Sequence, residues 1–153
     1  MNTQQRMLKR PSASPMHQTP APATAGTSVD TLVCDLANEL MNATTSFHKL
    51  HLKITGVGSY SAHKGLNELY DALPGHADDL VEQYQGACEM ILSMPDCCPR
   101  TLNSKEEAIQ YMRDLKVMTT NLQSKMPHSE ISNELDNVKS TLNSIKYKLM
   151  FLS

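Results

Sequence analysis

The chain has 153 residues, a formal net charge of −2 and 20% charged residues, so as a whole it is neither a strongly basic nucleic-acid binder nor a polyacidic chain. Aromatic residues make up only 5%, with no tryptophan, whereas methionine occurs ten times, and this balance favours helices over a β-sandwich. No apolar run approaches the ~18 residues that a transmembrane helix needs, so we expect no membrane partner.

The N-terminus and the cysteines indicate a cytoplasmic protein. The first residues lack the apolar core of a signal peptide, so secretion is not expected. Cys97 and Cys98 are adjacent, and with Cys34 and Cys88 they match neither a disulfide framework nor a zinc pattern. Reduced thiols are therefore expected, and a soft-metal or redox role for the adjacent pair is the alternative.

Residues 1–27 are predicted to form a disordered arm rich in proline, serine and threonine. The apolar residues of this segment follow no period, so it cannot bury enough surface to offset its ordering entropy. Arg6, Lys9 and Arg10 are its only charged side chains. The arm either binds DNA phosphates through these three cations or serves as a solubilising tail.

From residue 28 onward, apolar residues follow the period of α-helices. The first helix is predicted to start at Ser28 or Asp30, either of which can cap the amides of the first turn, and to end in a glycine-containing bend. The second helix should start near Ser59 or Ser61. Pro74 lies inside it and predicts a kink, because proline has no amide N–H for the helix.

Two more helices are predicted after a loop over residues 94–103. Ser104 and Glu107 have the spacing of a capping box at the start of the third helix. Pro127 indicates the turn before the fourth helix. The apolar residues of that helix recur in steps of four and three, as in the seam of a helix bundle: Ile131, Leu135, Val138, Leu142, Ile145, Leu149 and Leu152. Residues 28–153 are therefore predicted to form an all-α antiparallel four-helix bundle.

Histidines and carboxylates concentrate within residues 48–82. On the second helix, His63 and Asn67 are four residues apart on one side, and Asp78 and Glu82 continue nearly the same side further along. The separation between His63 and Asp78 corresponds to about 22 Å along a helix, so one chain cannot place both on a single ion.

A twofold axis would bring these groups together. If two copies crossed antiparallel near Leu73, each site would combine His51 and His63 of one chain with Asp78 and Glu82 of the other. Two imidazoles and two carboxylates suit iron, manganese or zinc. The alternative is that these side chains are solvated residues on an exposed helix face.

The segment from His51 to Glu82 resembles the ligand-bearing segment of the Dps family, the mini-ferritins. The positions that carry the resemblance are His51, Gly56, Tyr60, His63, Leu69, Tyr70, Asp78 and Glu82. The last helix, over residues 145–152, is also similar to the closing helix of that family.

The resemblance implies a ferritin-like bundle in which Fe(II) is bound between two subunits and oxidised by peroxide or dioxygen. It implies storage of the ferric mineral in a dodecameric homo-oligomer, and DNA protection through a basic N-terminal arm in some members. The implied ligands, and the residues that act in the oxidation, are His51, His63, Asp78 and Glu82.

The chain departs from the family pattern at several places. Asn67 stands where the family has an acid, and its amide oxygen is a neutral, weaker metal ligand. Leu52 stands where an aromatic residue is common, and Pro74 and Gly75 lie inside a helix that the family keeps unbroken. The second half is also short, as expected of a compact member encoded by a phage, which would act in a virion or an infected host cell.

Three functions follow from these patterns. The first is a mini-ferritin that binds and oxidises Fe(II) at a two-chain site, stores iron and protects DNA. The second is a ferritin-fold structural or interaction protein without ferroxidase activity. The third is DNA binding without iron, in which an oligomer multiplies the three cations of each arm.

Overall fold

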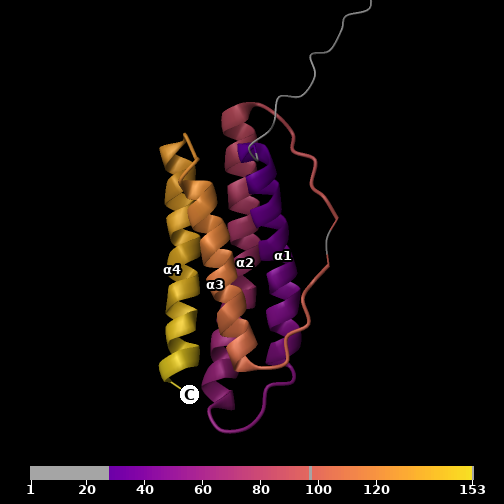
Figure 1. Ribbon diagram of the computed structural model, residues 1–153, viewed down its shortest axis with the longest axis vertical. Coiled ribbons are helices and arrows are strands. Elements are labelled where there is room, and N and C mark those ends of the chain that lie inside the picture. The colour runs from indigo at the N-terminus through magenta and orange to yellow at the C-terminus, as the bar shows by residue number, and fades with distance from the viewer. Residues whose placement is uncertain (1–27, 97, 153) are drawn as a thin grey trace, which may run out of the picture.

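The computed structural model describes residues 28–96 and 98–152, and within these ranges all regular structure is helical. The four helices are α1 (Val29–His51), α2 (Ser59–Cys88), α3 (Lys105–Gln123) and α4 (Ser129–Phe151) (Figure 1). The predicted arm over residues 1–27, including its cations, lies outside the described residues.

The helices form a four-helix bundle with one long crossover. Short bends join α1 to α2 and α3 to α4, whereas the segment between α2 and α3 runs the length of the bundle beside α1 (Figure 1). Helices α2 and α3 therefore point in the same direction and lie on a diagonal. Each helix packs on two neighbours that run opposite to it: α1 and α4 both pack against α2 and α3. The predicted all-α, antiparallel four-helix bundle is confirmed. Its single long crossover is a connection that ferritin-like folds also use.

The bundle interior is built from the predicted apolar stripes. Of the stripe predicted for α4, Ile131 through Leu149 is buried, whereas Leu152 is half-exposed because the helix ends at Phe151. Tyr111 and Phe47 are the bulkiest fully buried side chains, and their rings lie 5.2 Å apart between α3 and α1. At roughly 25 cal/mol per Å² of buried apolar surface, such contacts hold the four helices together.

Two serines fix helix starts as the sequence predicts. The Ser28 hydroxyl accepts a hydrogen bond from the Thr31 amide at 3.2 Å, and the Ser104 hydroxyl accepts one from the Glu107 amide at 3.2 Å. The Glu107 carboxylate reaches back to the amide of Asn103 at 2.7 Å, one residue further than in a standard capping box.

Arg100 holds the crossover against α1 and α3. Its guanidinium lies 4.0 Å from the centre of the Tyr111 ring and pairs with Glu39 at 2.5 Å and Asp114 at 2.9 Å. These contacts hold the crossover against α1 and α3. The crossover therefore does not cover the outer face of α2.

Helix α2 runs through Pro74 without a break. Its apolar residues keep their phase on both sides of the proline, and Leu73 and Ala77 are fully buried. Packing of this stripe against α1 and α4 offsets the loss of the backbone hydrogen bond that proline cannot donate.

None of the helices described is long and apolar enough to cross a membrane.

Candidate metal centre

The α1–α2 bend brings His51 and His63 face to face. Gly56 and Gly58 have positive φ angles of 95° and 74°, which other residues rarely adopt, so the chain reverses within seven residues. The two imidazole rings stack with their centres 3.6 Å apart. The predicted pairing of these two histidines is present within one chain.

A reciprocal pair of hydrogen bonds fixes both rings. The Nδ1 atom of His51 lies 2.9 Å from the carbonyl oxygen of His63, and the Nδ1 atom of His63 lies 3.2 Å from the carbonyl oxygen of His51. Because a carbonyl can only accept, both Nδ1 atoms must carry the proton. In the neutral rings, both Nε2 atoms therefore keep a lone pair that can bind a metal.

Tyr70 and His48 extend this cluster along α2 and α1. The His48 ring stacks on Tyr70 with centres 4.2 Å apart, and the Tyr70 ring meets His51 edge-on at 5.2 Å. The His51 side chain is only 7% exposed, whereas His63 is exposed. The imidazole pair is thus supported from inside the bundle and open on its outer side.

Asn67 is held by its neighbours on α2. Its amide oxygen accepts a hydrogen bond from the Tyr70 hydroxyl at 3.1 Å, and its amide nitrogen donates to the carboxylate of Asp71. Asp71 did not feature in the ligand set predicted from sequence. The signal that could have found it is its spacing of four from Asn67, which puts both on one side of the helix.

Asp78 and Glu82 lie further along the same uncovered face of α2, and both are exposed. Neither carboxylate takes part in a hydrogen bond or ion pair within residues 28–96 and 98–152. Within the part of the chain that the structure describes, no three histidine, cysteine or carboxylate side chains come close enough to hold one metal ion. One chain therefore supplies the imidazole pair and the carboxylate pair at separate places, as the helix geometry predicts.

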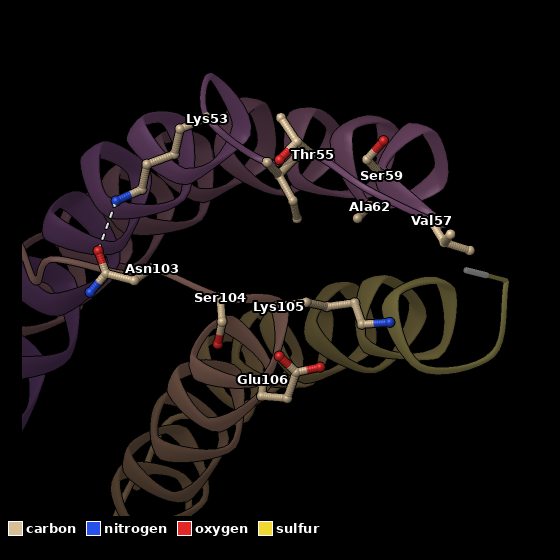
Figure 2. A pocket seen from close by; sticks show the side chains of 11 residues that line it. Lys53, Thr55, Val57, Ser59, Ala62, Asn103, Ser104, Lys105 and Glu106 are labelled. Carbon is tan, nitrogen blue, oxygen red and sulfur yellow. Dashed lines mark hydrogen bonds between the residues drawn. The ribbon is translucent and has the colours of Figure 1, made fainter.

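A polar cavity of about 270 Å³ lies at the same end of the bundle, where the α1–α2 bend meets the start of α3 (Figure 2). Lys53 donates a hydrogen bond to the Asn103 side chain at 3.1 Å across one edge of it. Its lining carries lysines and hydroxyl groups, and Glu106 is its only carboxylate side chain, so it does not have the ligands of the predicted metal site.

His76 takes part in a polar contact between α2 and α4 that the sequence pattern did not single out. Its side chain is 16% exposed, and its Nδ1 atom lies 2.6 Å from the Glu134 carboxylate on α4. Its Nε2 atom lies 3.0 Å from the Thr141 hydroxyl, and Asn137 donates to the second Glu134 oxygen at 2.9 Å. Glu134 and Thr141 are seven residues apart beside the apolar stripe of α4, and that spacing is the signal that sequence reasoning missed.

Arg6, Lys9 and Arg10 lie outside the described residues, and so does Cys97. Cys34, Cys88 and Cys98 are free thiols.

No curated protein matches the chain. The model of a family of unknown function, DUF5856, matches residues 51–149, about two thirds of the chain. The matched stretch begins at His51 and includes His63, Asp78 and Glu82, together with α2, the crossover, α3 and most of α4. The chain belongs to the DUF5856 family.

Proposed function

We propose that this protein is a Dps-like mini-ferritin that binds Fe(II) at a site shared by two copies, oxidises it and stores the product. The observation that carries the proposal is the His51–His63 pair. Both rings are held by backbone carbonyls in the tautomer that leaves Nε2 free, which is how histidine ligands are usually oriented at metal sites.

The carboxylates support the same proposal. Asp78 and Glu82 are exposed on the uncovered face of α2, and no cation within residues 28–96 or 98–152 pairs with either of them. A second copy crossing antiparallel near Leu73 would bring them to the imidazole pair. Two nitrogen and two oxygen ligands leave coordination positions for an oxidant, which the oxidation requires.

Fe(II) is the substrate in this proposal, and Mn(II) or Zn(II) would fit the same donors as non-oxidised competitors. The homo-oligomer is at least a dimer, and a closed dodecamer is the form in which a mineral could be stored. We place its action in a reducing, cytosol-like compartment, including an infected host cell, because Cys34, Cys88 and Cys98 are free thiols.

The alternative is a ferritin-fold structural or interaction protein without ferroxidase activity. Asn67 favours it, because an amide that is already hydrogen-bonded at both ends is a poorer ligand than a carboxylate.

Aerobic oxidation of Fe(II), followed by the ferric absorbance, separates the two functions. We expect the wild type to oxidise Fe(II) above the buffer rate, and His63→Ala and Glu82→Gln to lose this activity. His128→Ala is the matched control, because His128 lies at the opposite end of the bundle, and it should behave as the wild type. A wild type no faster than buffer would leave only the alternative.

Mixing the two inactive variants tests whether two chains share the site. A hybrid dimer of His63→Ala and Glu82→Gln subunits would contain one site with both defects and one site with neither. Co-refolded mixtures should therefore recover about a quarter of the wild-type activity, because about half of the dimers are hybrids with one of two sites intact. A site within one chain would recover nothing.

DNA protection is the part of the proposal that depends on the arm. We expect Arg6, Lys9 and Arg10 to bind phosphates, so replacing all three with glutamine should weaken a gel shift most at low salt. The matched control is the same number of Lys→Gln changes at Lys105, Lys125 and Lys146 in the bundle. Equal binding by the wild type and the arm variant would rule the arm out.

A further inference from the structure

Exposed apolar side chains gather at one end of the bundle, where the α1–α2 bend and the C-terminal end of α4 both lie (Figure 1). The start of α2 packs there on the last turns of α4, since a Cβ at Gly65 would meet the side chains of Leu149 and Lys148. Within the described part of the chain, seven of the eleven exposed large apolar residues belong to this end and form the apolar tip: Leu52, Val57, Tyr60, Tyr147, Met150, Phe151 and Leu152. The other four are Met41, Met90, Ile91 and Val117. Single exposed apolar residues are ordinary, whereas a gathering of this kind indicates a binding surface.

Lysines from all four helices and the bend lie at the same end as the apolar tip. They are Lys49, Lys53, Lys64, Lys105, Lys146 and Lys148, and the carboxylates among them are Glu68, Glu106 and Glu107. Lys49, Lys53 and Lys64 are exposed, and no ion pair within residues 28–96 or 98–152 uses them. At the opposite end, the exposed charges of α2 and its C-cap are all acidic: Asp78, Asp79, Glu82 and Glu89. Positive charge is therefore concentrated where the apolar side chains are exposed.

The polar cavity of about 270 Å³ opens at this same end (Figure 2). Lys53 and Lys105 line it together with the Ser59 hydroxyl, against the single carboxylate of Glu106. Ammonium and hydroxyl groups are donors that suit the oxygens of a phosphate. Val57 of the apolar tip also lines the cavity, so phosphate-binding donors and an exposed apolar side chain are neighbours.

This combination fits the surface of an anionic bilayer better than other partners. At the boundary between headgroups and acyl chains, apolar side chains leave water while lysines remain beside the phosphates. A nucleic acid would use the lysines, but its phosphate backbone offers no apolar layer for Leu52, Val57 and Leu152. A second copy docking through the same end would bring like-charged lysines together, which is unfavourable.

We propose that this end of the bundle binds the surface of an anionic lipid bilayer, with the apolar tip entering the interface and the lysines contacting headgroup phosphates. The expectation of no membrane partner rested on the lack of a spanning segment, which a peripheral contact does not need. The contact is also independent of the two-chain iron site, because every group that it uses belongs to one chain.

A single tryptophan tests whether the tip enters the bilayer, because the chain has none of its own. Val57 is fully exposed, so Val57→Trp should fold as the wild type does. With vesicles of phosphatidylcholine and phosphatidylglycerol, we expect its emission to shift to the blue and to be quenched by brominated acyl chains. Ile91→Trp is the matched control, because Ile91 is also largely exposed but lies at the opposite end, beside the start of α1. Its emission should not change.

Vesicle sedimentation tests the lysines in the full-length protein. Arg6, Lys9 and Arg10 are replaced by glutamine in every sample, so that the cations of the arm do not contribute. We expect Lys64→Gln to weaken binding about fivefold, as a lysine near an anionic surface contributes, and raised salt to weaken it further. Lys125→Gln, which removes an exposed lysine at the opposite end, should bind as the background protein does. Vesicles of phosphatidylcholine alone should lose most of the binding.

Several outcomes would overturn the proposal. One is a background protein that does not sediment with anionic vesicles, and another is an equal response from Val57→Trp and Ile91→Trp. Equal loss of binding in Lys64→Gln and Lys125→Gln would mean that the contact is not made by this end. Duplex DNA that binds through Lys64, in a protein that ignores vesicles, would assign the end to nucleic acid instead. Helical circular dichroism of each variant separates lost binding from lost folding.

Discussion

Tyr84 is a buried titratable side chain near the C-terminal end of α2, at the end of the bundle away from the histidine pair. It is 5% exposed, and its hydroxyl donates a hydrogen bond to Asp30 of α1 at 2.5 Å. Burial, and then the hydrogen bond to Asp30, raises the pKa of Tyr84 above its ordinary value. The folded protein therefore favours the neutral phenol, which ties the start of α1 to the end of α2.

The stability of the bundle should consequently fall in alkaline solution. The folded-state pKa of Tyr84 is raised, so its contribution is complete below the unfolded pKa of about 10 and is lost as the pH rises above that value. We expect urea midpoints to decline from pH 9 to 11 in the wild type and less steeply in Tyr84→Phe. Tyr147→Phe, which alters an exposed tyrosine of α4, should keep the wild-type slope. Identical slopes in all three would contradict the role of Tyr84.

At the scale of elements, two of the three glycines in α2 have opposite surroundings. A Cβ at Gly75 would meet nothing within 4 Å, whereas a Cβ at Gly65 would lie 2.8 Å from the Leu149 side chain of α4. Glycine inside a helix costs roughly 1 kcal/mol relative to alanine. Gly75 therefore lowers the stability of α2 without making a contact that needs glycine. Gly65, in contrast, lacks the Cβ that would collide with Leu149, so α4 can pack closely against α2.

We expect Gly75→Ala to raise the free energy of unfolding by about 1 kcal/mol. Gly65→Ala should give no gain, because the fully buried Leu149 would have to move and overpacking typically costs about 1–3 kcal/mol. Chemical denaturation of the two variants beside the wild type measures both. Equal stabilisation by both changes would mean that the α2–α4 contact has room for a methyl group at residue 65.

The elements were predictable from sequence wherever local chemistry decides them. Ser28 and Ser104 cap helices at the expected places, and the α4 stripe is buried up to Leu149. The sequence also places Pro74 inside the second helix rather than at its end, and α2 is one continuous helix through it.

The candidate site was predictable only in part, because sequence reports spacing along a helix but not contacts between helices. His51 and His63 could be paired across a glycine bend, and the uncovered side of α2 follows from helix periodicity. The His76–Glu134 contact joins residues of α2 and α4 far apart in the chain, and periodicity alone does not pair them. The hydrogen bond from Asn67 to Asp71 depends on the orientation of the Asn67 amide, which the hydrogen bond from Tyr70 fixes in the folded chain.

At the scale of the whole molecule, the crossover decides which face is free. It runs beside α1 and is held there by Arg100, so it does not cover the face of α2 that carries the candidate ligands (Figure 1). Pro74 is exposed and lies near the middle of that face. A proline at the centre of a helix–helix contact adds no charge and no long side chain, so two such faces could approach each other closely.

We expect light scattering to show a mass at least twice the 17.0 kDa of one chain, and Pro74→Arg to shift it toward the monomer. Two arginines would face each other near the twofold axis and repel, while loss of the proline should strengthen α2 by up to about 3 kcal/mol. Dissociation could then not be attributed to unfolding. Gln83→Arg, an exposed change on another side of α2, should leave the mass unchanged. If the wild type remained a monomer at every concentration, no second copy would bring its imidazoles to Asp78 and Glu82. The proposed two-chain Fe(II) site would then be incomplete, which would contradict the proposed function.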